Sequence, residues 1–194
     1  MIPPKLSNKS LVGIADLEAI GYTRFQIPAL MRREELRRVS RGVYCWVHAP
    51  LSENVSIATV AKRVPKAVIC LLTALRYHDI GTQNPYAVWI ALPPGVRIPT
   101  IENLTVSAVH IGEPYLTIGT TAVELDGVSL TITDPARTVV DCFRFRNVVG
   151  LDVALEALSE AHRKRKCTAD ELVTIAKKCR VYAVMKPYME SIFR

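Results

Sequence analysis

The fold is decided by residues 15–44, which read ADLEAIGYTRFQIPALMRREELRRVSRGVY. The stretch predicts a short helix that ends at Gly21, a tight turn, a second helix and then a β-hairpin. Ile14, Leu17 and Ile20 are spaced three apart, which places them on one face of the first helix. The order of these elements is that of a winged helix-turn-helix.

The second helix has a clear predicted start. Thr23 can cap it, and Gln26 follows three residues later, as in a capping box. Pro28 is expected to close the first turn, because a proline deeper in a helix removes a hydrogen bond. Ile27, Leu30 and Met31 recur at helical spacing and form the expected buried stripe. The same periodicity turns the opposite side outward, namely Phe25, Gln26, Ala29, Arg32 and Arg33, with Arg24 on the flank.

Residues 36–47 alternate as two strands around Ser40-Arg41-Gly42, where the glycine can take the positive φ of a hairpin turn. This hairpin is the expected wing. Residues 24–41 hold six arginines and two glutamates, and guanidinium groups match both phosphate and the guanine edge. The blander interpretation is that basic surface residues only keep a common helix-plus-hairpin unit soluble. The residues expected to contact DNA are Thr23, Arg24, Gln26, Arg32, Arg33, Arg37, Arg38 and Arg41.

The chain of 194 residues is predicted to hold two domains. Residues 1–50 form the winged helix-turn-helix, after an irregular start over residues 1–10, and residues 51–194 form a larger mixed α+β domain. The net charge is +7, and residues 1–50 carry +4 of it on about a quarter of the chain. Such a balance favours a polyanionic partner.

The larger domain is expected to begin with helices, continue with strands and end with helices, which is an α+β order. Asp126-Gly127 marks a hairpin turn. Asp134 and Thr168 are predicted helix caps. The predicted helices cover 56–64, 68–77, 135–145, 151–162, 168–178 and 186–193; the predicted strands cover 86–92, 104–110, 115–118, 122–125 and 128–133.

The five cysteines are odd in number and show no CxxC spacing, which predicts reduced thiols rather than disulfides or a zinc site. No basic-then-apolar leader opens the sequence, and its apolar stretches are too short to cross a membrane. A soluble, cytoplasmic protein without membrane contact is therefore expected.

Two separated motifs resemble the AbiEi family, the antitoxins of type IV toxin-antitoxin systems of abortive infection. The first runs from Leu17 to Tyr44 and contains an LxRVxRGVY pattern at Leu36, Arg38, Val39, Arg41, Gly42, Val43 and Tyr44. The second is Thr133–Asp141, which is similar to the DPxRTxxD segment of the same proteins. Two matches in the family's order suggest that the resemblance spans nearly the whole chain.

The resemblance implies a transcriptional autorepressor that binds inverted repeats in its own promoter. It also implies an antitoxin that opposes a nucleotidyltransferase toxin without forming a stable complex with it. In that family the N-terminal winged helix binds double-stranded DNA, and the larger domain is needed for antitoxin action.

No catalytic residue, metal ligand set or cofactor site is predicted, because hydrolase, nuclease, metalloprotease and nucleotide-binding signatures are all missing. Arg137 and Asp141 are expected to be structural, either as a weak surface pair or as a buried tie of their helix to the sheet; a site for toxin control is the other interpretation. The run Arg163, Lys164, Arg165 and Lys166 is either a solvated helix end or a secondary phosphate contact.

Two alternatives to a DNA-binding repressor stay open. The winged helix could serve protein or RNA contacts in a non-catalytic interaction module. The chain could also be an enzyme with an unrecognised site, which clustered carboxylates in a pocket would indicate.

Overall fold

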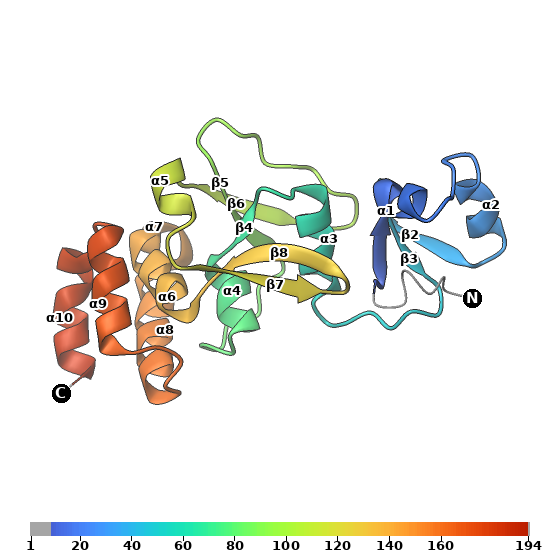
Figure 1. The fold of residues 1–194 in the computed structure, drawn as a ribbon. Coiled ribbons are helices and arrows are strands. Elements are labelled where there is room, and N and C mark those ends of the chain that lie inside the picture. The colour runs from blue at the N-terminus through green and yellow to red at the C-terminus, as the bar shows by residue number, and fades with distance from the viewer. Residues whose placement is uncertain (1–8, 194) are drawn as a thin grey trace. The chain divides into compact units, whose positions relative to one another are not determined.

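The computed structural model describes residues 9–193, so the irregular start expected over residues 1–10 lies almost entirely outside the described residues. Its elements are β1 (Leu11–Gly13), α1 (Ile14–Ala19), α2 (Ile27–Arg32), β2 (Leu36–Ser40), β3 (Val43–Trp46), α3 (Val55–Arg63), β4 (Val68–Ile69), α4 (Leu71–Tyr77), β5 (Val88–Leu92), β6 (Val106–His110), α5 (Glu113–Leu116), β7 (Thr120–Leu125), β8 (Val128–Thr133), α6 (Pro135–Arg144), α7 (Arg146–Val149), α8 (Leu151–Arg163), α9 (Ala169–Lys178) and α10 (Tyr182–Ile192) (Figure 1). The mixed α+β class is as expected.

The chain forms two compact units, and each is built from several segments. Unit 1 holds residues 1–66, 99–106 and 122–130; unit 2 holds residues 67–98, 107–121 and 131–194. This division differs from a single cut after residue 50. Two later segments belong with the N-terminal residues, because side chains and backbone groups of the first 66 residues hydrogen-bond to them.

Unit 1 contains the winged helix-turn-helix elements and a three-stranded antiparallel sheet of order β1-β3-β2. Residues 11–13 form an edge strand of this sheet. The core consists of apolar side chains from each of these elements: Val12, Leu17, Ile27, Leu30, Leu36 and Trp46. The wing hairpin turns at Gly42, whose φ of +77° suits a residue without a Cβ.

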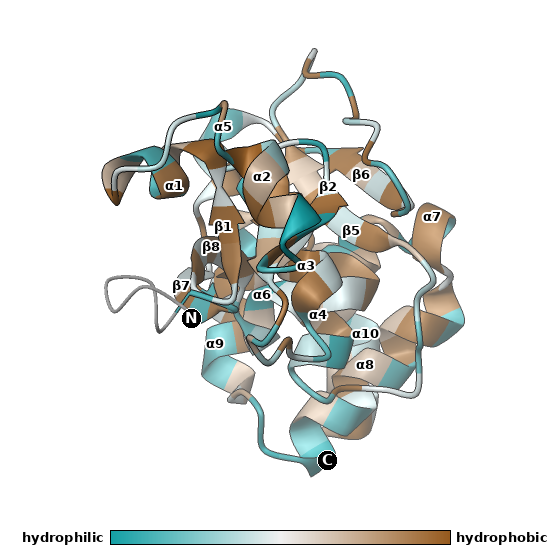
Figure 2. Ribbon diagram, turned by 90° about the vertical axis from the view of Figure 1, so that its right-hand side faces the viewer, coloured by the Kyte–Doolittle hydropathy of each residue, from teal (hydrophilic) through white to brown (hydrophobic). Residues whose placement is uncertain are grey.

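A second sheet has the order β6-β5-β4-β8-β7, with β4 parallel to β8 and antiparallel to β5. Within unit 2, the core joins strand residues such as Val68 and Val109 to α4, α6, α8, α9 and α10. Helix α6 is central, since it packs on α4, α8 and α9, which lie beside it in Figure 1. In Figure 2, α8 carries both hydrophobic and hydrophilic residues, as an amphipathic helix with one buried face does.

Two predicted elements of unit 2 are wrong. Residues 68–77 were expected to form one helix, but Val68 and Ile69 form β4 and the helix begins at Leu71. Pairing with strands on both sides outweighs the helical spacing of this apolar run, and Cys70 takes an extended conformation between the two elements. Residues 115–118 were expected to form a strand, but Pro114 in the first turn helps to begin the short helix α5.

The five cysteines are free, as predicted, and all except Cys167 are buried. Among residues 9–193, no helix has the length and apolar character needed to span a membrane.

Candidate nucleic-acid interface

The helix-turn-helix of unit 1 is held by a tight turn and a small core. Gly21 ends α1 with a φ of +98°, and the Tyr22 N–H donates to the Leu17 carbonyl at 3.1 Å. Leu17, Ile27 and Leu30 are buried together, which fixes the position of α2 against α1. The tertiary contacts therefore stabilise two helices that are each too short to persist alone.

The capping box predicted at Thr23 and Gln26 is present in part. The Thr23 N–H donates to Gln26 Oε1 at 2.8 Å, and its hydroxyl lies 3.2 Å from the same oxygen. The Gln26 N–H closes a turn to the Thr23 carbonyl, so regular helix begins only at Ile27, with Pro28 in its first turn as expected. Because Oε1 is engaged by Thr23, Gln26 has its amide NH₂ available but would have to leave Thr23 to contact adenine bidentately.

The outward face of α2 agrees with the helical periodicity except at one position. Gln26, Arg32 and Arg33 are exposed, and Ile27 and Leu30 are buried. Met31 was expected in the buried stripe, but 37% of it is exposed. The helix is only six residues long, so its buried face needs just two anchoring side chains.

Phe25 lies on the predicted outward face but is not among the residues expected to contact DNA. The structure leaves it 94% exposed immediately before α2. An exposed aromatic ring at this position is within reach of a bound duplex, and apolar groups contact the thymine methyl in the major groove.

The six arginines of residues 24–41 fall into two groups. Arg24 forms an ion pair with Glu18, and Arg38 forms one with Glu102, each with an N to O distance of 2.9 Å. Within residues 9–193, the exposed side chains of the other four have no ion-pair partner: Arg32, Arg33, Arg37 and Arg41. These four cations are not neutralised by a carboxylate, although the Arg37 side chain also contacts Cys45.

The wing receives a further cation that the sequence did not reveal. Arg63 Nη1, at the end of α3, donates to the backbone carbonyl of Arg41 at 3.0 Å. Only the tertiary fold brings residue 63 to the wing turn, so no local pattern could have identified it. By contrast, Lys62 is neutralised by Asp16. Burial raises the pKa of the Asp16 carboxyl, but hydrogen bonds from Lys62, the Gly13 N–H and Lys9 outweigh it and lower that pKa overall.

A groove of about 460 Å³ adjoins the C-terminal end of α2. Its apolar lining includes the exposed side chains of Met31 and Val47, and its charged lining includes Glu34, Arg37 and Arg38. This combination of apolar and charged lining residues suits either a side chain of a protein partner or a phosphate.

In unit 2, three of the four basic side chains of residues 163–166 form ion pairs with acidic neighbours. Arg163 pairs with Glu160, and Lys164 lies 2.8 Å from the same carboxylate. Hydrogen bonds from Lys164 and Arg163 lower the pKa of Glu160 to about 2. Lys164 and Lys166 also approach Asp79, at 3.3 and 3.9 Å. A phosphate contact by this run stays a prediction.

The second motif of the resemblance is structural and buried. Asp134 caps α6 by accepting from the Arg137 N–H at 2.7 Å, as predicted. Arg137 is 1% exposed and lies 2.8 Å from Asp141, so the pair is not the surface pair considered from the sequence. Its Nη1 donates to the carbonyls of Tyr115 and Ile118 at 2.8 and 2.6 Å, which ties α6 to the segment after α5 rather than directly to a strand.

Metal ligation and the Cys142 and Cys167 thiols offer no reactive centre within residues 9–193. Within residues 9–193, no three His, Cys, Asp or Glu side chains are grouped so that they could hold a metal ion. Burial raises the pKa of the Cys142 thiol and raises that of Cys167 to about 12. These sulfurs are therefore protonated, weakly nucleophilic thiols near neutral pH.

No family model matches the sequence, and no curated protein matches it. Among solved structures, the chain is similar to the RV2827C protein from Mycobacterium tuberculosis, with a TM-score of 0.56 and 16% sequence identity over 91% of this chain and 72% of that chain. At this identity the likeness concerns the fold alone, and membership of the AbiEi family stays a prediction. The chain thus shares a mixed α+β fold with that mycobacterial protein.

Proposed function

We propose that the protein is a double-stranded DNA-binding transcriptional regulator and that unit 1 is its DNA-binding part. The observation that carries the proposal is the set of exposed arginines on α2 and the wing that form no ion pair among the described residues. The exposed ring of Phe25 precedes them, just before α2 begins. In a winged helix-turn-helix the second helix enters the major groove, while the wing meets the backbone or the minor groove.

The residues have distinct proposed roles. Arg32 and Arg33 on α2 read base edges, and Phe25 contacts a thymine methyl group. Arg37 and Arg41 hold phosphates, and Arg63 adds charge beside the wing turn. Arg24 and Arg38 contribute less than the sequence suggests, because Glu18 and Glu102 already neutralise them.

A gel-shift series on the DNA upstream of the protein's own gene tests these roles. Arg32→Ala should cost about 1–3 kcal/mol and relax specificity at one position of the site. Arg41→Ala should weaken binding to all sequences alike and reduce the salt slope by about 1.

The chain offers two matched controls for this series. Arg97 is an exposed arginine of unit 2, and Arg97→Ala should leave affinity unchanged. Arg38→Ala should have a smaller effect than Arg41→Ala, because the Glu102 carboxylate already competes for that guanidinium. Unchanged affinity for both Arg32→Ala and Arg41→Ala would remove the assignment.

The finer proposal is that the protein represses its own promoter at inverted repeats and acts as a type IV antitoxin. Its support is the pair of motifs that resemble AbiEi antitoxins, at residues 17–44 and 133–141. A nucleotidyltransferase toxin encoded next to the gene should inhibit growth when it is expressed alone, and co-expression of this protein should restore that growth. A pull-down between the two proteins should recover no stable complex. Continued toxicity would refute the antitoxin role and leave DNA binding to be judged separately.

A non-catalytic interaction module is the second candidate, and the groove beside α2 favours it. Exposed Met31 and Val47 provide apolar surface that a protein partner could cover. A salt titration discriminates the two, because DNA affinity that falls steeply between low and physiological salt indicates phosphate neutralisation.

A further inference from the structure

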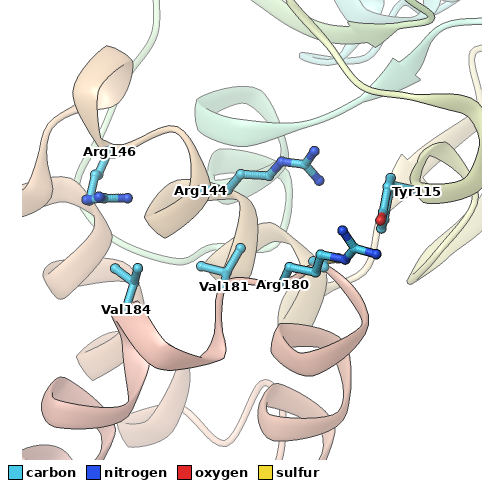
Figure 3. A pocket seen from close by; sticks show the side chains of 7 residues that line it. Tyr115, Arg144, Arg146, Arg180, Val181 and Val184 are labelled. Atoms are coloured by element: carbon cyan, nitrogen blue, oxygen red, sulfur yellow. The ribbon is translucent and has the colours of Figure 1, made fainter.

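Unit 2 contains a pocket of about 370 Å³ whose charge is unusual (Figure 3). Three of its seven lining residues are arginines and none is acidic; the lining consists of Tyr115, Arg144, Arg146, Cys179, Arg180, Val181 and Val184. Arg144 and Arg180 extend toward Tyr115 from different elements, as Figure 3 shows. A recess that gathers cations without a carboxylate is suited to an anion.

Arg144, the last residue of α6, is the central cation of this pocket. Its guanidinium carbon lies 5.3 Å from the centre of the Tyr115 ring and 5.6 Å from that of Phe145. Its Nη1 is buried and has no hydrogen-bond partner among the described residues. Leaving a buried charged donor unmatched is costly, so an acceptor supplied by a ligand would stabilise this side chain.

The rest of α6 explains why Arg144 is left over. Arg137, Asp141 and Arg144 recur at i, i+4 and i+7 on one buried face. Asp141 is ion-paired with Arg137 at 2.8 Å, and the nearby Arg144 charge acts on it only through space, since no ion pair joins Asp141 to Arg144 among the described residues. Arg137 also fixes the backbone of Tyr115, whose ring then forms a wall of the pocket. Arg137 of the second motif therefore positions one wall of the pocket.

Arg180 supplies a cation from the turn between α9 and α10. Its φ is +59°, and the bond from the Val181 N–H to the Ala176 carbonyl at 2.8 Å closes the helix end. Glycine or asparagine normally occupies this left-handed position, so local structure gives no reason for an arginine here. Arg146 lines the side of the pocket away from Tyr115, where its Nη1 donates to the Phe143 carbonyl at 3.0 Å (Figure 3).

We propose that this pocket binds a small phosphomonoester, with the phosphate between the guanidinium groups of Arg144 and Arg180 and the organic part against Tyr115, Val181 and Val184. A dianionic phosphate matches several guanidinium groups better than a single carboxylate does. The volume lies at the lower end of the range for small-molecule sites. The backbone of a duplex is a poor fit, because Arg144 lies partly buried inside the recess.

Binding is tested on the whole protein with phenyl phosphate, inorganic phosphate and phenol as probes. Phenyl phosphate should bind saturably with one site per chain in calorimetry and raise the thermal unfolding midpoint. Inorganic phosphate should bind more weakly, and phenol should give no saturable binding. Failure of phenyl phosphate to saturate at millimolar concentration overturns the proposal, and so does binding of phenol as tight as that of phenyl phosphate.

Two variants and a matched control locate the site. Arg144→Met and Arg180→Asn should each lower the affinity for phenyl phosphate by about tenfold or more, because each removes a charged donor. Arg180→Asn places a tolerated residue in the left-handed conformation, so it should remain folded. Arg97 is an exposed arginine of unit 2 that does not line this pocket, so Arg97→Asn should leave the affinity unchanged. An equal loss in Arg97→Asn overturns the assignment to this pocket.

A measurement of duplex DNA affinity separates this proposal from DNA binding by unit 1. Arg144→Met should bind the upstream DNA as the parent protein does. A matching loss of duplex affinity would show that these arginines meet nucleic-acid phosphates and would overturn the small-molecule proposal. Because α2 and the wing are unchanged in this variant, failure of the pocket and failure of the proposed DNA-binding surface are distinguishable.

Discussion

At the scale of single residues, Arg137 and Asp141 show how much a tertiary setting changes an interaction. As a solvated i, i+4 pair they would contribute about 0.3 kcal/mol. In the structure the pair is buried, and Arg137 also donates to two backbone carbonyls. A buried pair of this kind adds little net stability over an apolar replacement, but removal of one partner leaves an uncompensated charge.

Arg137→Met is therefore expected to lower the free energy of unfolding by about 3–5 kcal/mol. The double variant Arg137→Met with Asp141→Leu should recover a large part of that loss, because no buried charge is left unpaired. Urea unfolding followed by circular dichroism measures both. A loss below about 1 kcal/mol for the single variant would contradict the role of the pair.

His78 makes stability depend on pH. Burial lowers the pKa of its imidazole below 6.5, although a hydrogen bond to the Thr133 carbonyl at 2.7 Å partly opposes the shift. The unfolded chain then binds more protons than the folded chain as the pH falls through 6.5, so acidification destabilises the fold. We expect the free energy of unfolding to fall from pH 7 to pH 5, and His78→Gln to flatten this part of the profile. An unchanged slope in His78→Gln would assign the dependence to other groups.

At the scale of elements, local capping chemistry agrees with the structure where the motif is complete. Thr168 accepts from the Glu171 N–H at 3.2 Å, and Glu171 accepts from the Thr168 N–H at 2.7 Å, so α9 begins with the predicted box. At Thr23 only one half of the box is present, and regular helix starts four residues later.

Thr168→Ala should destabilise the protein by about 1 kcal/mol, because α9 loses the side chain that satisfies its first turn. Thr168→Ser keeps the hydroxyl and should lose only a few tenths of that. Thermal unfolding compares the two variants, and equal losses for serine and alanine would show that the methyl group rather than the cap is responsible.

At the scale of the whole molecule, the chain passes back and forth between its two units. The Leu11 N–H donates to the Asp126 carbonyl at 3.0 Å, and the Asp126 carboxylate accepts from Ser52 at 2.9 Å. Arg38 pairs with Glu102. Unit 1 is thus completed by residues 99–106 and 122–130, which are distant in sequence.

A fragment of residues 1–66 is expected to unfold at a lower temperature than unit 1 of the full chain and to bind DNA more weakly. The reason is that it lacks the partners of Leu11, Arg38 and Ser52. Thermal scans and limited proteolysis of the fragment and the full chain make the comparison. A fragment with the stability and affinity of the full chain would show that those contacts contribute nothing.

The sequence by itself determined the wing and its turn, the caps at Asp134 and Thr168, and most of the outward face of α2. These features follow from interactions within a few residues: a positive φ at Gly42, a side chain that reaches the next turn, and apolar spacing along one helix.

Only the tertiary structure decided the strand at Val68–Ile69, the exposure of Met31, the neutralisation of Arg38, the approach of Arg63 to the wing and the arginine pocket around Arg144. Each depends on which distant segment lies alongside. Strand pairing, ion pairing and burial are set by neighbours in space, and no local periodicity encodes them.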